Sequence, residues 1–112
     1  LSAPGAGIHD QHDKRNAFAD WNHLFIPYCT ADAHGGNATK KYNDFITLHH
    51  RGRINSLTAL EWIFNKIPDP DVVGTVGCSA GSLGAIINAP YVMSHYAAKN
   101  ATTKLFYFGC DV

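Results

Sequence analysis

The chain has 112 residues, enough for one small domain but short for an entire α/β enzyme. Hydrophobic residues make up 46% and charged residues 16%, a balance that excludes a disordered segment or a coiled coil. Nine basic side chains balance nine acidic ones, which excludes a strong electrostatic surface for nucleic acid. No apolar run approaches the roughly 18 residues of a membrane span, and the N-terminus has no signal-peptide pattern. We therefore expect neither a nucleic acid nor a membrane as partner.

The first half of the chain predicts few regular elements. Residues 1–16 show no hydrophobic periodicity and are expected to form a loop. Residues 23–29 are a short apolar run and predict a strand, with Pro27 at its end or at a sheet edge. Residues 30–43 are polar and glycine-rich, which is typical of a functional loop after a strand. A second short strand is expected over residues 45–49.

The second half predicts alternating helices and strands. A helix is expected over residues 53–67, because the apolar side chains recur at spacings of three and four: Leu57, Leu60, Phe64 and Ile67. Residues 72–76 predict a strand buried on both faces, and residues 104–108 another strand. Between them, residues 83–98 predict a helix that Pro90 breaks or kinks. This order indicates an α/β fold with a mainly parallel sheet.

The motif Gly77-x-Ser79-x-Gly81 lies between a predicted buried strand and a predicted helix, and it matches the nucleophile elbow of α/β-hydrolases. In such an elbow a sharp turn strains the serine backbone and exposes its hydroxyl oxygen, while the glycines let neighbouring backbone approach. The N–H of Ala80, at the positive end of the helix, is placed to stabilise a tetrahedral oxyanion. We therefore predict Ser79 as the nucleophile and Ala80 as an oxyanion donor.

Three other interpretations of the motif remain open. The glycines could simply permit a tight junction, or the domain could bind a partner without catalysis. The helix N-terminus after Gly77 and Gly81 could also hold a phosphate or nucleotide. That last alternative is weakened because the glycines lack the G-x-G-x-x-G spacing and no acidic residue lies between Val72 and Cys110. Cys78 fits a nucleophile less well, because the glycines are symmetric about Ser79.

The general base expected for Ser79 is missing from this sequence. In α/β-hydrolases the acid and the histidine follow the serine; here the only histidine that does so is His95 and the only acid is Asp111. A helical segment would carry His95 on the order of 20 Å away from the elbow. His34, His49 and His50 precede the serine and violate the usual order.

The seven histidines of the chain raise the question of a metal site. The best pairs are His9-x-x-His12 and His49-His50, but neither has a third ligand at a recognised zinc spacing. We expect no metal and no cofactor.

Several segments together resemble the pectin acetylesterase/Notum family of carboxylesterases. They run in family order across nearly the whole chain: Gly7-Ile8, NAFADWNHLFIPYC (16–29), TADAHGGN (30–37), HRGR (50–53) with Asn55, and GCSAGSLG (77–84). The resemblance implies a secreted serine carboxylesterase that removes an acyl group, expected to be acetyl, from a carbohydrate such as pectin by an acyl-enzyme mechanism. The partner would be an acylated polysaccharide or another acyl-ester substrate.

The resemblance also implies that residues 1–112 are part of a larger α/β-hydrolase-type domain. Ser79 and Ala80 match the family nucleophile and its oxyanion donor. The other oxyanion donors would lie before residue 1 and the triad Asp and His beyond residue 112, so this segment alone would be inactive. Asp111 matches an Asp after a core strand that is not the triad acid.

Two further expectations concern the predicted strand ends. The loop carrying Asp32, His34 and Asn37 is expected to line the substrate pocket. Three cysteines, Cys29, Cys78 and Cys110, all follow or end predicted strands, so two of them could form a disulfide, although the sequence does not say which two.

Overall fold

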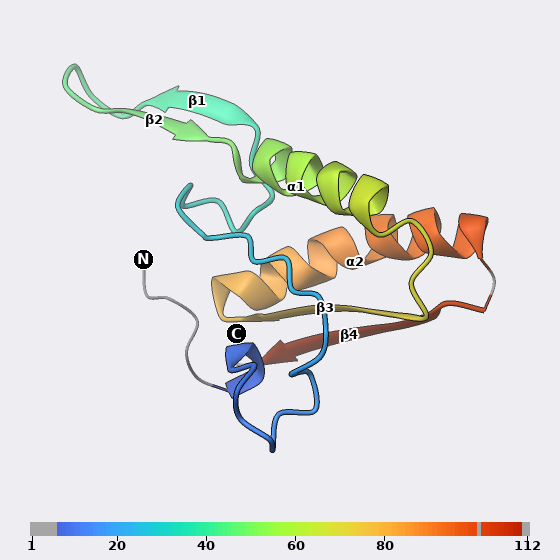
Figure 1. The fold of residues 1–112 in the computed structure, drawn as a ribbon. Helices are drawn as coiled ribbons and strands as arrows, with labels where there is room; N and C mark the ends of the chain where they lie inside the picture. Colours follow the sequence, from blue (N-terminus) through green and yellow to red (C-terminus); the bar gives the residue numbers. More distant parts are fainter. Residues whose placement is uncertain (1–6, 101, 111–112) are drawn as a thin grey trace.

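The structure is a computed structural model that describes residues 7–100 and 102–110. The described chain is a small α/β fold with two separate two-stranded sheets (Figure 1). Its elements in chain order are the 3₁₀ turn η1 (Gly7–His9), β1 (Ala38–Lys41), β2 (Thr47–His50), α1 (Gly52–Lys66), β3 (Val72–Cys78), α2 (Ala80–Lys99) and β4 (Lys104–Cys110).

The centre of the fold is the β3–α2–β4 unit. β3 and β4 are parallel and pair in register from Val72 opposite Lys104 to Cys78 opposite Cys110. The predicted strands over 72–76 and 104–108, and the helix between them, are therefore confirmed. The expectation of a fully buried strand is wrong, however: β3 is only partly buried, with Val76 and Cys78 exposed, and its sheet has just two strands.

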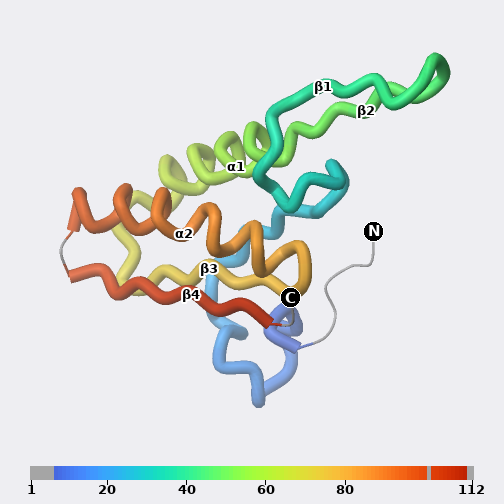
Figure 2. The backbone as a smooth tube through the Cα atoms, turned by 180° about the vertical axis from the view of Figure 1, so that it is seen from behind, coloured from blue at the N-terminus to red at the C-terminus, as the bar shows by residue number. Residues whose placement is uncertain are grey.

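The hydrophobic core lies between the two helices and the parallel sheet. Leu60 and Phe64 of α1 pack with Val92 and Tyr96 of α2, and Val73 and Leu105 of the sheet border this cluster. In both views α1 lies on one side of α2 and the strands on the other (Figures 1 and 2). The predicted helix over 53–67 is confirmed, but its buried stripe is spaced every four residues: Gly52, Ser56, Leu60 and Phe64.

The opposite face of the parallel sheet is covered by part of the N-terminal segment. A Cβ on Gly74 would collide with the ring of Phe106, its register partner, so this ring lies across β3. Phe18 and Trp21 pack on the same ring, with centroids 6.3 and 6.0 Å away. Leu105 packs toward the helices, and neighbouring residues of a strand point to opposite faces. The aromatic group around Phe106 is therefore on the side away from α2.

The prediction of a strand over residues 23–29 is wrong. These residues have no regular secondary structure, and neither sheet includes them. A strand needs hydrogen bonds to a neighbour, and none of the described strands pairs with this segment. Pro27 also lacks the N–H that a ladder would use.

The prediction of a loop over residues 30–43 is wrong for residues 38–41, which form strand β1. β1 pairs with β2 in an antiparallel hairpin, with Ala38 opposite His50 and Lys41 opposite Thr47. The hairpin stands away from the rest of the fold (Figures 1 and 2). Its residues are almost all exposed, so no hydrophobic alternation marked β1 in the sequence.

Helix α2 continues through Pro90, so the proline does not break it. Proline within a helix costs about 3 kcal/mol, because it removes one hydrogen bond and crowds the preceding turn. The buried side chains around it, Ala89, Val92 and Tyr96, supply packing that keeps this turn helical. None of the helices among the described residues combines the length and apolar character needed to cross a membrane.

Candidate active site

Ser79 is the single residue between the end of β3 and the start of α2. Its backbone has φ 53° and ψ −125°, a conformation that residues with a Cβ rarely adopt. Holding a residue in such a region costs of order 1–3 kcal/mol, and it persists only where the surroundings enforce it. The side chain is exposed. These are the properties expected of a serine at a strand-to-helix elbow.

Backbone hydrogen bonds hold Ser79 on both sides. Its N–H donates to the carbonyl oxygen of Cys110 at 3.0 Å, and its own carbonyl accepts from the N–H of Ser82 at 2.9 Å. The hydroxyl makes no cap bond to α2, although Ser79 occupies the N-cap position. Within residues 7–100 and 102–110, Ser79 Oγ has no hydrogen bond to a histidine or a carboxylate. The nucleophile candidate is positioned here without a base beside it.

The two glycines of the motif play different parts. A Cβ on Gly77 would collide with the carbonyl group of Gly81, so Gly77 is needed for the close approach of β3 to the first turn of α2. A Cβ on Gly81 would meet nothing within 4 Å. The expectation that both glycines permit close approach therefore holds for Gly77 alone.

Ala80 is the first residue of α2, and its N–H points out of the helix start. The first N–H groups of a helix have no partner within the helix. Among the described residues no acceptor outside the helix receives the Ala80 N–H. The first turn of α2 also contains no acidic side chain that would oppose an anion. The exposed serine hydroxyl and this free N–H thus belong to consecutive residues.

The loop over residues 30–37 lies against the starts of both helices, with Asp32 at its centre. Asp32 Oδ2 accepts the N–H of Gly52, the first residue of α1, at 2.7 Å. Its Oδ1 accepts from Thr30 Oγ1 at 2.6 Å and from the His34 N–H at 3.1 Å. Burial raises the pKa of Asp32, but these hydrogen bonds outweigh it and hold the pKa below its usual value. Asp32 therefore acts as a cap for α1.

His34 fixes the same loop to α2. Its backbone has φ 61° and its side chain is 7% exposed. A Cβ on Gly84 would come within 2.5 Å of the His34 ring, so the ring packs directly on the second turn of α2. The loop is therefore in direct contact with α2 through the His34 ring.

The third residue of the expected pocket lining, Asn37, has a structural partner instead. Its Oδ1 accepts from the guanidinium of Arg51 at 2.6 Å. The neighbouring Arg53 spans the two helices, because it donates to Asn88 Oδ1 at 3.0 Å and its N–H donates to the carbonyl of Gly36. The loop is thus a support for the start of α2. Whether it also lines a substrate pocket stays a prediction.

The cysteine pairing is decided by strand register. Cys78 and Cys110 are opposite each other at the ends of β3 and β4 and form a disulfide that closes a separation of 32 residues. Cys29 is a free, exposed cysteine. The prediction that two of the three cysteines pair is confirmed, and Cys78 of this pair directly precedes Ser79.

His95 lies near the other end of α2 from Ser79. Its ring stacks on Phe64 with centroids 3.7 Å apart, and burial together with the charge of Lys99 lowers its pKa. A surface hollow beside it is lined by Glu61, Phe64, Asn65, Tyr91 and His95. A second hollow is lined by His9, Gln11, Trp21, Asn22, His23 and Phe25. Neither hollow includes Ser79.

The histidine pairs do not come together as metal ligands. His50 binds Thr30 and Tyr42 through its two ring nitrogens, whereas His49 contacts Thr39. The side chains of consecutive strand residues lie on opposite faces. No cluster of three or more His, Cys, Asp or Glu residues suited to a metal occurs in the described part of the chain.

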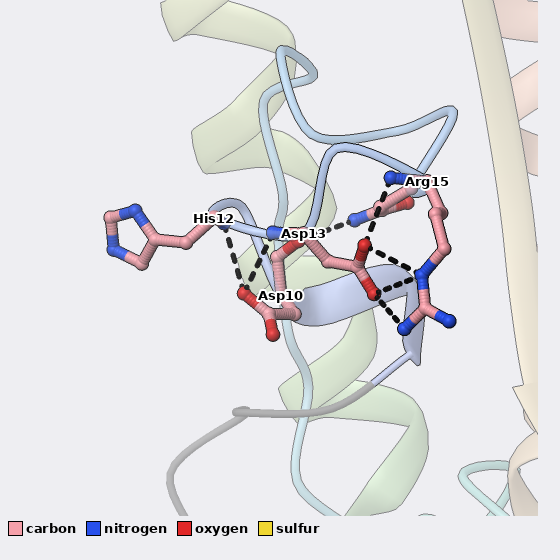
Figure 3. Close-up of polar contacts among 5 residues, drawn as sticks. Asp10, His12, Asp13 and Arg15 are labelled. Atoms are coloured by element: carbon pink, nitrogen blue, oxygen red, sulfur yellow. Dashed lines mark hydrogen bonds and ion pairs between the residues drawn. The ribbon is translucent and has the colours of Figure 1, made fainter.

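The side chains around His12 also do not point toward a common position where they could bind a metal (Figure 3). Asp10 accepts the N–H groups of His12 and Asp13, and the His12 ring points away from both carboxylates. Asp13 forms an ion pair with Arg15, whose guanidinium nitrogen is 2.8 Å from the carboxylate. Hydrogen bonds from Arg15 hold the pKa of Asp13 below its usual value.

Comparison with known proteins gives one family. The model of the family described as Pectinacetylesterase matches residues 2–107. No curated protein and no solved structure matches the chain.

Proposed function

Because this chain belongs to the pectinacetylesterase family, we propose that it supplies the nucleophile of a serine esterase that removes acetyl groups from an acetylated polysaccharide such as pectin. Membership supports a carbohydrate acetylesterase activity at the level of the family. The observation that carries the mechanism is the exposed Ser79, whose φ of 53° places it in a strained turn between β3 and α2.

In the proposed reaction, Ser79 Oγ attacks the carbonyl carbon of the acetyl ester while a general base takes its proton. The N–H of Ala80 stabilises the negative oxygen of the tetrahedral intermediate. When that intermediate collapses, the bond to the sugar oxygen breaks and the oxygen leaves with the proton from the base. Water then hydrolyses the acetyl-enzyme and releases acetate. The chemistry needs no cofactor.

We propose that the general base and its orienting acid come from residues outside the described chain. What supports this is that no histidine is hydrogen-bonded to Ser79 Oγ within residues 7–100 and 102–110. It agrees with the family resemblance, which implies an Asp and a His after residue 112. In this interpretation the chain is part of an α/β-hydrolase-type domain, and the β3–α2–β4 unit is its centre.

We also propose that the protein acts outside the cell. The disulfide between Cys78 and Cys110 supports this proposal, because such bonds persist mainly in oxidising compartments. An extracellular polysaccharide is the substrate class that fits such a location.

The test is covalent labelling of the full protein chain with a fluorophosphonate, followed by intact-mass measurement and peptide mapping. We expect one adduct on Ser79, and acetate release from acetylated pectin that is lost in Ser79→Ala. Ser94→Ala is the matched control, because Ser94 is an exposed serine within α2, the helix that follows Ser79. A wild-type chain that neither labels nor releases acetate would overturn the enzyme proposal.

That negative outcome would favour the alternative of a non-catalytic binding domain. The observation behind this alternative is that no base contacts Ser79 in the described residues. A pull-down of acetylated pectin with Ser79→Ala protein distinguishes the esterase proposal from the binding-domain alternative. Retained binding together with an unlabelled wild type would identify a binding domain, whereas retained binding with a labelled wild type is what an esterase predicts.

A further inference from the structure

The Cys78–Cys110 disulfide lies at the elbow itself. Cys78 is the last residue of β3 and directly precedes Ser79, and Cys110 is the last residue of β4. The two Cα atoms are 4.5 Å apart, within the range of about 4.4–6.8 Å that disulfides span. The bond therefore closes the β3–α2–β4 unit covalently at the end that carries the nucleophile candidate.

A second link joins the same two strand ends. The N–H of Ser79 donates to the carbonyl oxygen of Cys110, so Ser79 is tied to β4 through its own backbone as well as through Cys78. The disulfide sulfur of Cys110 also lies 3.7 Å from the carbonyl oxygen of Gly77. Residues 77–79 are thus all in contact with Cys110, the last residue of β4.

This support coincides with the strained backbone of the site. Ser79 has φ 53°, which a flexible strand end would relax toward a more common conformation. On the helix side, Ser79 is held by hydrogen bonds from the N–H groups of Ser82 and Leu83. On the strand side, the holding contacts are the bond to the Cys110 carbonyl and the disulfide next to it.

We infer that the Cys78–Cys110 disulfide positions the nucleophile, by holding the end of β4 where its carbonyl fixes Ser79 in the strained turn. The inference rests on the proposed role of Ser79. Both cysteines are positioning residues, because they act on the backbone of Ser79 and take no part in the ester chemistry. The bridge thereby links the reactivity of Ser79 to the redox state of the protein.

A disulfide that only stabilised the fold would have a different effect on activity. Its loss would lower the unfolding midpoint, but the molecules that stay folded would react at the normal rate. A positioning disulfide affects the folded molecules. Misplacing a reacting group by about 1 Å can cost on the order of 100-fold in rate, while binding of the rest of the substrate is unaffected. The kcat value should therefore fall without a matching rise in KM.

The experiment compares Cys78→Ser/Cys110→Ser with Cys29→Ser in the full protein chain, below the unfolding midpoint of each. Cys29→Ser is the matched control, because Cys29 is free and exposed. We expect the double variant to lose about 10- to 100-fold in kcat and in the rate of fluorophosphonate labelling, with KM changed less than about twofold. The control should match the wild type.

A second measurement applies if the double variant does not fold. In Cys29→Ser protein, a dithiol reduces the bridge: the reagent becomes a cyclic disulfide, and Cys78 and Cys110 take up two electrons and two protons as free thiols. The labelling rate of Ser79 should fall and then return after reoxidation. Hydrogen exchange in the peptide containing Ser79 should rise, whereas exchange in residues 85–99 of α2 should change little.

Three results would overturn the inference. The first is an oxidised protein in which peptide mapping finds no Cys78–Cys110 bond. The second is a folded protein without the bridge that keeps its labelling rate and kcat. The third is a wild type that never labels, which defeats the proposed nucleophile as well. A wild type that labels on Ser79 but releases no acetate defeats only the proposed substrate, and the labelling comparison still decides the role of the bridge.

Discussion

The carbonyl group of Gly81 occupies the space that a Cβ on Gly77 would need, whereas the corresponding space at Gly81 is empty. The two glycines look equivalent in the motif, since each stands two residues from Ser79. In the structure, one is a steric requirement of the turn and the other is an ordinary position in the first turn of α2.

This difference predicts opposite results for two alanine substitutions. Gly77→Ala should destabilise the protein by about 2–3 kcal/mol, because the new methyl group overlaps backbone that cannot move aside. Gly81→Ala should leave stability unchanged or raise it by up to about 1 kcal/mol, since alanine favours a helix. Urea unfolding of both variants measures the difference. Equal losses of stability would show that Gly81 also has a steric role.

The backbone of Ser79 predicts a stability order at the elbow. Ser79→Gly and Ser79→Ala should both abolish labelling, but the glycine variant should be more stable by about 1 kcal/mol, because glycine adopts positive φ without strain. At Ser94, within α2, the order should reverse by about the same amount. Thermal or urea unfolding of the four variants tests this. The same order at both positions would contradict a strained Ser79.

The contact between His34 and Gly84 predicts energetic coupling. Gly84→Ala should cost about 1–3 kcal/mol, because its methyl group meets the His34 ring. In a His34→Ala background, the same change should cost less, giving a coupling free energy of about 1 kcal/mol or more. Gly81→Ala in both backgrounds is the control and should be additive. Additive effects at Gly84 would mean that the loop does not support α2 as described.

The lowered pKa of Asp32 predicts that the protein loses stability in acid. Its pKa is lower in the folded protein than the unfolded value of about 3.9, so its contribution is complete above that pH and disappears as the pH falls through the folded pKa. Asp32→Ala should therefore destabilise by about 1 kcal/mol at pH 7, through loss of the α1 cap, and by less near pH 3.

The measurement for Asp32 is urea unfolding from pH 7 to pH 3. Asp13→Ala is the control, because Asp13 also has a lowered pKa but its partner Arg15 is exposed. Exposed ion pairs contribute little to stability, so this variant should follow the wild type. A difference between Asp32→Ala and the wild type that stays constant with pH would show that the charge of Asp32 is not what caps α1.

Local patterns in the sequence were enough to define the β3–α2–β4 unit and the position of Ser79. The β-branched run before Gly77, the helical spacing in residues 53–67 and the motif itself all act within a few residues. Such signals hold in most tertiary surroundings, which is why these elements and helix α1 were predicted almost to their observed bounds.

Contacts between distant segments decided the remainder. Residues 23–29 have strand character but no neighbour to pair with, while the exposed β1 forms through its partner β2. Which two cysteines join depends on the register of β3 and β4, and the separate roles of Gly77, Gly81 and Gly84 depend on which atoms lie next to them. The sequence by itself determined where the strand-to-helix turn at Ser79 is, because a turn is a local structure. Only the tertiary structure decided what holds it, because hydrogen-bond partners, disulfide partners and steric neighbours come from parts of the chain that meet on folding.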